Sequence, residues 1–457
     1  MDKDISLKTY AQDEVSVEAG LQSVVKPFIS AKWFAWFVCA LGATFYFYEY
    51  LLRVSPSVMT HQLMETYQIS ATGLGHLSAC YYYVYAPMQL PVGVLMDRYG
   101  PRLLLLFACL SCALGTYLFS CSSSIRVAEL GRFLVGFGSA FAFVGVLKLA
   151  TIWLPPNRFA IVSGMTMALG MVGGLTGENL LNQLVTHYGW KATTYGSAVV
   201  GTVLTAILFF FLHDGFKSGH AAADAKQLPD FKSAFSGLFK IIKNSQIWIN
   251  GLIGCLMYIP TSVFAELWGP PFFVSVYKFS ETTSVAVVSM IFLGWAIGGF
   301  VVGWASDRLG KRRAPMTVGS LFAAALLALV FYYPHMSAWT VGAIFLIFGV
   351  FSSAQVLVFA VGHEISCSKS AGTAIALTNM FVMLGGVLFQ PIVGILLDMF
   401  WSGNLGPNGV HIYAAKEFQI ALSVLPIGLL LSVVLTFALR ETHGMVKNSD
   451  VPVKRVV

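Results

Sequence analysis

The sequence predicts an all-α membrane protein of twelve transmembrane helices, arranged as two six-helix bundles that are related by a parallel repeat. Three observations lead to this prediction. Of the 457 residues, 57% are hydrophobic and 11% are charged, against about 25% charged residues in an ordinary soluble domain. Twelve apolar segments are each long enough to cross a bilayer, and one charged turn occurs twice. This composition excludes a soluble globular enzyme.

The apolar segments follow one another along the chain with mostly short polar connections. A helix of about 20 residues, rising 1.5 Å per residue, crosses the hydrocarbon layer. The predicted spans are 32–55, 72–95, 102–121, 127–153, 159–184, 190–212, 247–274, 283–305, 314–333, 338–362, 371–397 and 417–439. The predicted organisation is a tail at 1–31, an N-terminal six-helix bundle at 32–212, a linker at 213–246, a C-terminal six-helix bundle at 247–439 and a tail at 440–457.

The distribution of Lys and Arg predicts the orientation of these spans. Of the 28 basic residues, 21 lie in the tails and in the loops after even-numbered spans, 4 lie in the other loops and 3 lie inside spans. Positive residues near short loops remain in the cytoplasm. We therefore expect both termini to be cytoplasmic, in a multi-pass protein of a bacterial inner membrane. The first 31 residues lack the basic, apolar and small-residue order of a cleavable signal peptide.

The linker 213–246 contains an apolar stripe at helical spacing. Its members are Phe231, Phe235, Leu238, Phe239 and Ile242, with three lysines around them. This pattern is typical of an amphipathic helix that lies at the inner membrane surface. We interpret it as a connector, and a separate regulatory role is the alternative.

A charged turn follows span 2 and recurs after span 8. Residues 93–102 read GVLMDRYGPR, and residues 303–312, which lie 210 positions later, read GWASDRLGKR. A six-span parallel repeat with the same turn at the same place indicates two bundles that rock about a central site. The doubled turn resembles the signature loop of the major facilitator superfamily, G-x-x-x-D-R-x-G-R/K-R/K. Pro101 departs from that pattern, because the family usually has a basic residue there.

The resemblance implies a secondary transporter that works by alternating access, and it implies which residues switch its conformation. Asp97 and Asp307 occupy places where a carboxylate can meet a helix N-terminus and basic side chains in one orientation of the bundles. Arg132 lies before a run of glycines in span 4, as the family's arginine does. The candidate switch residues are Asp97, Arg98, Arg102, Arg132, Asp307, Arg308 and Arg312. Simple anchoring of the inner face by positive charge is the alternative.

The glycines of spans 5 and 11 also agree with the resemblance. Span 5 holds five glycines between 164 and 177, and span 11 holds three between 385 and 394. Small residues let helices approach closely. Family transporters pack these two helices across the contact between the halves, and we expect the same here.

Span 1 contains Glu49 and Arg53, although a charge inside a span costs about 2.5–3.5 kcal/mol. The two residues are four apart, so they can form a local ion pair. Alternatively, Arg53 reaches the outer surface. A third interpretation rests on resemblance to helix 1 of the organic-anion branches of the superfamily, in which an arginine here holds an acidic substrate group. Leu52 stands where those branches have an aspartate.

Glu266 in span 7 is the predicted proton-coupling residue. Aligning Ser55-Pro56 with Gly269-Pro270 places Glu266 opposite Leu52, next to Arg53 in the symmetric helix. The resemblance implies that helices 1 and 7 both line the cavity. Glu266 would then pair with Arg53 in the empty state and accept a proton when substrate takes the arginine. A solvated acid at the outer end is the alternative, and Glu49 is the next coupling candidate.

Further substrate-binding candidates are polar residues inside spans. They are Tyr46, Tyr50, Lys148, Tyr258, Gln355 and Asn379. Lys148 can instead reach the inner surface, and the tyrosines can instead pack or form interfacial belts. We assign Glu178 in span 5 to packing or to solvent.

The chain shows no machinery for catalysis or for ATP-driven pumping. No P-loop, G-x-S-x-G or H-E-x-x-H motif occurs, and the seven cysteines lack the paired spacing of a metal site. We expect no enzyme activity, cofactor, metal or nucleic acid. The predicted function is proton-coupled symport of a small anionic or zwitterionic metabolite across the lipid bilayer by a monomer. The alternatives are a proton-antiport exporter, a facilitator without ion coupling, and a receptor built on a transporter fold.

Overall fold

The computed structural model describes residues 31–155, 158–213, 241–366, 371–406 and 408–443. Within these ranges the chain is almost entirely helical, with a single β-bridge between Leu405 and His411. The predictions for residues 1–30 and 444–457, and for most of the amphipathic helix of the linker, lie outside the described residues.

Each predicted span of the N-terminal half is helical in the structure. The elements are α2 (Ala31–Val54), a 3-10 turn η1 (Ser55–Val58), α3 (Thr60–Tyr67), α4 (Ala71–Tyr99), α5 (Pro101–Cys121), α6 (Ile125–Trp153), α7 (Phe159–Tyr188) and α8 (Trp190–Phe211). Pro56 in η1 lacks a backbone N–H, so α2 ends directly after Arg53 and Val54.

The spans of the C-terminal half are helical too, but several are divided. The elements are α11 (Ser245–Ile259), η4 (Pro260–Trp268), α12 (Gly269–Phe272), η5 (Phe273–Tyr277), α13 (Glu281–Leu309), α14 (Arg313–Tyr332), α15 (Ala338–Ser352), η6 (Ser353–Val356), α16 (Leu357–Glu364), α17 (Ala371–Met399), α18 (Ala415–Leu422) and α19 (Val424–Ala438). The sequence predicted one continuous span over 247–274. In the structure this span is divided, because Pro260 has no N–H to donate to the residue four positions earlier. The wider π-helix η4 begins at this proline.

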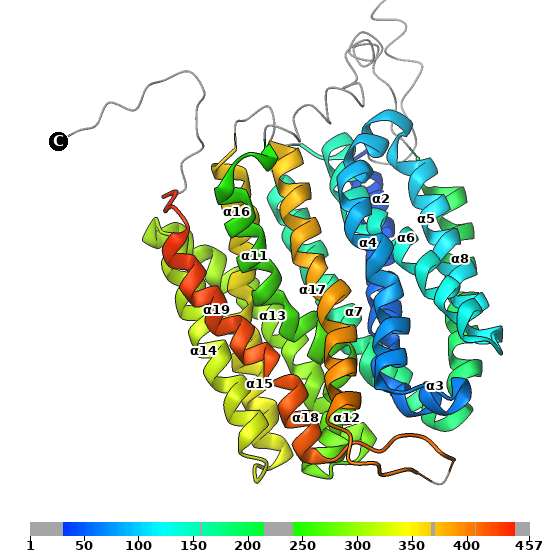
Figure 1. Ribbon diagram of the computed structural model, residues 1–457. Helices are drawn as coiled ribbons and strands as arrows, with labels where there is room; N and C mark the ends of the chain where they lie inside the picture. Colours follow the sequence, from blue (N-terminus) through cyan, green and yellow to red (C-terminus); the bar gives the residue numbers. More distant parts are fainter. Residues whose placement is uncertain (1–30, 156–157, 214–240, 367–370, 407, 444–457) are drawn as a thin grey trace, which may run out of the picture.

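Ten helical segments in the described ranges are long and apolar enough to cross a membrane. α4 and α7 are not among them, and both bury polar side chains, including Gln89 and Glu178. α2 begins and α19 ends at the same face of the bundle (Figure 1), which we call the terminal face. The other end, where α3, α12 and α18 lie, is the opposite face.

Two helix pairs join the halves: α4 packs against α17, and α7 packs against α13. Glycines allow the first contact to be close. A Cβ added at Gly75 of α4 would lie 2.5 Å from the Gln390 carbonyl oxygen, and one at Gly394 of α17 would lie 2.4 Å from the Ala71 carbonyl oxygen. The expectation that spans 5 and 11 pack across the halves is confirmed. Span 5 (α7) packs against span 8 (α13), and span 11 (α17) packs against span 2 (α4).

Candidate functional site

The centre of the bundle contains a closed triangle of Arg53, Glu49 and Tyr81. The Arg53 Nη2 atom lies 3.0 Å from Glu49 Oε1, and Arg53 Nε donates to the Tyr81 hydroxyl at 3.0 Å. That hydroxyl in turn donates to Glu49 Oε2 at 3.1 Å. Arg53 is 3% exposed and Glu49 is fully buried. The structure therefore has the local ion pair that the spacing allowed, and it removes the alternative that Arg53 reaches the surface.

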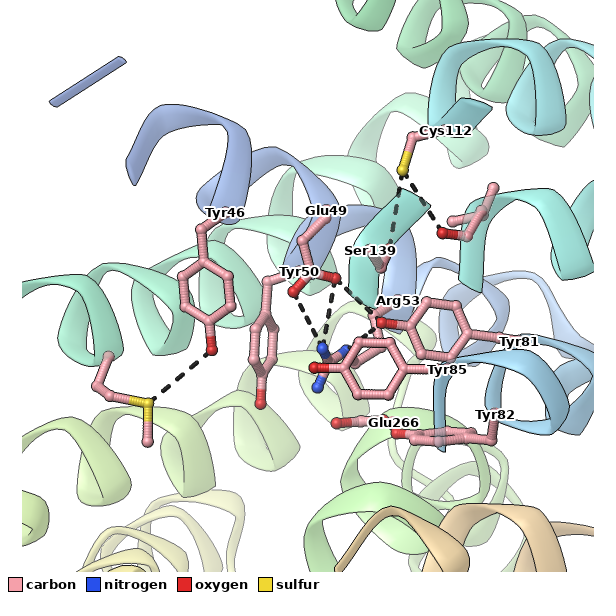
Figure 2. Close-up of polar contacts among 12 residues, drawn as sticks. Tyr46, Glu49, Tyr50, Arg53, Tyr81, Tyr82, Tyr85, Cys112, Ser139 and Glu266 are labelled. Carbon is pink, nitrogen blue, oxygen red and sulfur yellow. Dashed lines mark hydrogen bonds and ion pairs between the residues drawn. The ribbon is translucent and has the colours of Figure 1, made fainter. Parts of the chain in front are cut away.

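Aromatic rings of α2 and α4 surround the Arg53 guanidinium. Its central carbon lies 4.5 Å from the ring centroid of Tyr50 and 4.9 Å from that of Tyr85. A guanidinium over an aromatic face is attracted by the ring quadrupole, and more so when water is excluded. Figure 2 shows this cage of rings around Arg53. The rings and the ion pair hold the arginine in one orientation, in which Nε donates to Tyr81 and Nη2 donates to Glu49.

Arg132 of α6 binds the backbone at the C-terminal end of α2. It donates to the carbonyl oxygens of Leu52 at 2.9 Å and Arg53 at 3.4 Å. A cation at a helix C-terminus is stabilised by the helix dipole and satisfies carbonyls that have no helical partner. Predicted as a switch residue, Arg132 is placed instead at the central cluster, where it positions the backbone that carries Arg53.

Glu266 reaches the same cluster from the C-terminal half. It accepts hydrogen bonds from the hydroxyls of Tyr82, in α4, and of Tyr258, in α11, the latter at 3.4 Å. Figure 2 shows Glu49 and Glu266 on opposite sides of the Arg53 guanidinium. The expected direct pair between Arg53 and Glu266 is not formed in this conformation, because Glu49 holds the arginine.

Two contacts in this cluster connect the halves. The Tyr82–Glu266 hydrogen bond joins α4 to η4, and the hydroxyls of Tyr50 and Tyr258 lie 3.2 Å apart, joining α2 to α11. All four side chains are buried. Any rotation of one half against the other must change these contacts.

The remaining substrate-binding candidates lie in different parts of the bundle. Tyr46 is buried one turn before Tyr50, with its ring 6.0 Å from the Tyr50 ring. Asn379 donates to Gln89 Oε1 at 2.8 Å, across the contact of α17 with α4. Gln355 is buried in η6, and its Nε2 atom has no hydrogen-bond partner among the described residues. Lys148 is not brought to the cluster; it is bound at the terminal face.

The charged turn of the N-terminal half lies at the terminal face. Lys148 of α6 pairs with Asp97 of α4 at 2.6 Å. Arg102 donates to the Phe209 carbonyl oxygen of α8 at 3.2 Å, and Arg98 lies over the ring of Tyr99. The turn thus ties α4 to α6, and α5 to α8, within its own half.

The turn of the C-terminal half carries a larger network. Arg312 pairs with Asp307 at 2.6 Å and with Glu364 of α16 at 2.9 Å, while Arg308 lies over the Trp304 ring. Burial alone would lower the pKa of Arg312, but hydrogen bonds to Glu364 and Asp307 outweigh it and raise the pKa. Glu441, beyond α19, accepts from the backbone nitrogens of Arg312 at 2.7 Å and Arg313 at 3.1 Å.

A third polar contact closes the opposite face, where Asp398 of α17 meets the start of α4. Asp398 Oδ2 accepts from the Ser70 hydroxyl at 2.6 Å and from the Thr72 backbone nitrogen at 2.9 Å. The Tyr413 hydroxyl accepts from the Ala71 backbone nitrogen at 2.9 Å and donates to Asp398 Oδ1. Burial is the largest cause that raises the pKa of Tyr413, and its bond to Asp398 adds to this.

Sequence reasoning missed several of these residues. Tyr81, Tyr82 and Tyr85 are not among the predicted site residues, although their spacing of three and four places them on one helical face. Asp398 gave no signal, because a carboxylate near the end of a predicted span is ordinary. What distinguishes Asp398 is the contact of its carboxylate with the N-terminus of α4, a helix of the other half.

Two six-helix halves that meet over a buried cluster of charges, with polar contacts at both faces, define a secondary transporter of the multi-pass membrane class. The chain belongs to the major facilitator superfamily, since the model of that family matches residues 22–390.

Curated relatives are similar over most of their length. The chain is 24% identical over 417 residues to the membrane sensor protein UhpC of Salmonella typhimurium, covering 86% of this chain and 90% of the relative. It is 22% identical to the probable sulfoacetate transporter SauU of Cupriavidus necator, covering 79% and 86%. It is 23% identical to the hexuronate transporter of Bacillus subtilis, covering 78% and 79%.

Solved structures agree on the fold. A bacterial homolog of the human lysosomal transporter Spinster aligns with a TM-score of 0.72 at 16% identity, covering 89% of this chain and 97% of that one. The nucleoside transporter NupG aligns with a TM-score of 0.69 at 12% identity, covering 88% and 99%. These likenesses establish the fold. The transporter family, together with relatives named as transporters, supports a protein that is not an enzyme.

Proposed function

We propose that this protein is a monomeric, proton-coupled symporter of a small organic anion in a bacterial inner membrane. The observation that carries the proposal is the buried Arg53, which Glu49 and Tyr81 hold from the N-terminal half while Glu266 approaches from the C-terminal half. Arginine's planar fork of donors matches a carboxylate, sulfonate or phosphate group.

The names of the relatives support an anionic substrate. Sulfoacetate and hexuronate, named for two of them, and hexose phosphate, named for a relative in Chlamydia pneumoniae, all carry a compact anionic group. Each such group can accept two hydrogen bonds from one guanidinium. A zwitterion with a carboxylate fits the same arginine.

Coupling to protons follows from the number of acids around Arg53. An incoming anion competes with Glu49 for the guanidinium and brings a third negative charge near Glu49 and Glu266. Burying that charge is costly unless an acid takes up a proton. Glu266 is our candidate, since its hydrogen bonds to Tyr82 and Tyr258 connect its protonation to the contact between the halves.

The orientation in the membrane follows from the 21 to 4 distribution of basic residues. The terminal face is cytoplasmic in this proposal, and the opposite face is outside. Single cysteines at Ser218 and at the exposed Ser402, in a background without native cysteines, should be labelled from opposite sides. Labelling of both from outside would contradict the orientation.

The anion site is tested by Arg53→Lys, which keeps the charge and loses the fork. A thermal-shift screen of anionic, zwitterionic and cationic metabolites first identifies a ligand, because binding to the folded state raises the apparent stability. We expect Arg53→Lys to bind the selected anion at least about tenfold more weakly, the loss of one charge-assisted hydrogen bond. Arg126→Lys, at an exposed arginine in the first turn of α6, is the matched control. Unchanged binding by Arg53→Lys would show that Arg53 is structural.

Glu266→Gln tests the coupling separately. Glutamine resembles a permanently protonated acid, so binding and substrate exchange should persist in proteoliposomes. Uphill uptake driven by a pH gradient should be lost. If Glu266→Gln still concentrates the substrate, coupling runs through another acid, and Glu49 is the next to replace.

The similarity to UhpC favours one second candidate, a membrane sensor that binds an organic anion without moving it. Both functions use the same Arg53 site, so binding does not separate them. Net flux of the selected anion into proteoliposomes does: a sensor shows ligand-dependent stabilisation but no flux.

A further inference from the structure

Glu178 of α7 is a buried acid that the proposed mechanism does not use. It is fully buried, ten residues before the end of α7 at Tyr188, which is about 15 Å along the helix. Its Oε1 atom accepts from the Ser57 hydroxyl of η1 at 3.3 Å. Its Oε2 atom is buried without a hydrogen-bond partner among the described residues. The sequence had favoured packing or solvent for this residue, and the structure excludes solvent.

Ser57, which supplies the one hydrogen bond to Glu178 among the described residues, also donates to a backbone carbonyl. The Ser57 hydroxyl lies closer to the Val54 carbonyl oxygen, at 2.8 Å, and its single proton serves one acceptor at a time. No ion pair of the described residues includes Glu178. An ionised carboxylate buried in a membrane protein without donors or a counter-ion is strongly disfavoured.

The charges on neighbouring elements do not change this conclusion. Arg53 of α2 is paired with Glu49, and Arg132 of α6 is bound to carbonyls at the end of α2. Glu266 of η4 is a further buried acid, and it is hydrogen-bonded to Tyr82 and Tyr258. On α13, the residues that contact the adjacent Asn179 and Gly174 are Ser289 and Phe292, neither ionisable. The ionisable side chains of α8, Lys191 and Tyr195, are exposed.

Glu178 lies where the two halves meet. Asn179, the next residue, donates to the Ser289 hydroxyl of α13 at 2.9 Å. One turn earlier, a Cβ added at Gly174 would lie 3.1 Å from the Phe292 ring of α13. Closure of α7 against α13 therefore shuts Glu178 away from water, and separation of these helices at the opposite face would admit water to it.

We propose that Glu178 is a proton-binding site, separate from Glu266, whose protonation is required for the halves to close at the opposite face. Water from that side supplies the proton when the halves are apart, and the neutral acid is buried on closing. The inference rests on the proposed function only in requiring an open conformation. It needs neither a substrate nor a pH gradient, so it fails or holds independently of anion transport.

The test measures closure directly with spin labels. Cysteines replace the exposed Tyr188 and Thr282, at the opposite-face ends of α7 and α13, in a background without native cysteines. Their distance distribution gives the ratio of open to closed protein without substrate. The ratio should rise with pH in the unsubstituted background, by up to tenfold per pH unit for one linked proton. A ratio independent of pH overturns the proposal without any variant at Glu178.

Three substitutions then locate the proton. Glu178→Gln should stay closed at every pH, whereas Glu178→Asp should keep a pH dependence. Because Glu266 also bonds across the halves, each Glu178 variant is made in a Glu266→Gln background as well, and that background should keep the pH dependence that Glu178 supplies. His411 lies 3.6 Å from Asp398 at the opposite face, so each measurement is repeated with His411→Asn. The proposal is overturned if Glu178→Gln retains the pH dependence or stays open, or if Glu266→Gln or His411→Asn alone removes it.

Discussion

The Oδ2 atom of Asp398 lies 2.9 Å from the backbone nitrogen of Thr72 and accepts its hydrogen bond. Asp398 belongs to α17 of the C-terminal half, and Thr72 belongs to the first turn of α4 in the N-terminal half. The first N–H groups of a helix have no partner within it, and a carboxylate there also gains from the helix dipole. One half therefore caps a helix of the other, and this cap breaks whenever the halves separate at the opposite face.

Removing the cap should favour the open conformation. A lost N-cap costs about 0.5–2 kcal/mol, which corresponds to a change of about two- to thirtyfold in an equilibrium. Asp398→Ala should raise the ratio of open to closed protein by this factor, measured with labels at Tyr188 and Thr282. Asn404→Ala, at an exposed position of the loop that follows α17, is the control. An unchanged ratio in Asp398→Ala would show that the cap does not contribute to closure.

Tyr81 and Tyr83 allow a matched test of the central cluster. The Tyr81 hydroxyl bonds both Arg53 and Glu49, whereas the Tyr83 hydroxyl bonds the exposed His76. Tyr81→Phe removes one hydrogen-bond partner from each of two buried charged groups, Arg53 and Glu49, which costs about 1–3 kcal/mol. We expect it to weaken anion binding by about tenfold, measured by calorimetry with the anion from the screen. Tyr83→Phe should bind normally, and an equal loss in both variants would reject a specific role for Tyr81.

The contrast between these two tyrosines also shows how far the sequence alone leads. Helix positions follow from apolar length and the doubled charged turn, which do not depend on tertiary contacts. The spacing of Glu49 and Arg53 allowed the ion pair that the structure has, as one of three interpretations. The Tyr82–Glu266 contact did not, because it depends on how two separate halves meet. Pro260 was visible in the sequence, yet the π-helix that carries Glu266 is a response of the packed helix to the missing donor.

The charged turns should control the conformational cycle and leave the anion site intact. Asp97 pairs with Lys148 at 2.6 Å, and Asp307 pairs with Arg312 at 2.6 Å. Asp97→Asn and Asp307→Asn should slow exchange in proteoliposomes while the dissociation constant changes by no more than a few fold, since neither acid touches Arg53. The effect of Asp307→Asn should be the smaller one, because Arg312 keeps its bond to Glu364.

The exposed Lys278→Gln, at the opposite face, is the control for this pair. Exchange at the normal rate in the double variant of Asp97 and Asp307 would reject the switch. It would favour the alternative, in which the turns anchor the terminal face by their positive charge.

The last prediction concerns the pH dependence of stability at the terminal face. Burial alone would raise the pKa of Glu441, but the backbone N–H groups of Arg312, Arg313 and Thr442 outweigh it and hold the pKa below its ordinary value of 4.5. A carboxyl with a depressed folded-state pKa contributes stability above its unfolded-state pKa. That contribution is lost as the pH falls through the folded-state value.

Glu441→Gln should therefore lower the thermal unfolding midpoint at pH 7, by about 1–3 °C for a partly exposed group in a chain of this size. The difference from the unsubstituted protein should shrink as the pH falls below 4.5 and vanish below the folded-state pKa, because Glu441 is then protonated too. Glu281→Gln, at an exposed acid of the opposite face, should leave the midpoint unchanged throughout. A difference for Glu441→Gln that stays constant down to the lowest pH would mean that lost packing, and not the charge on Glu441, stabilises the terminal face.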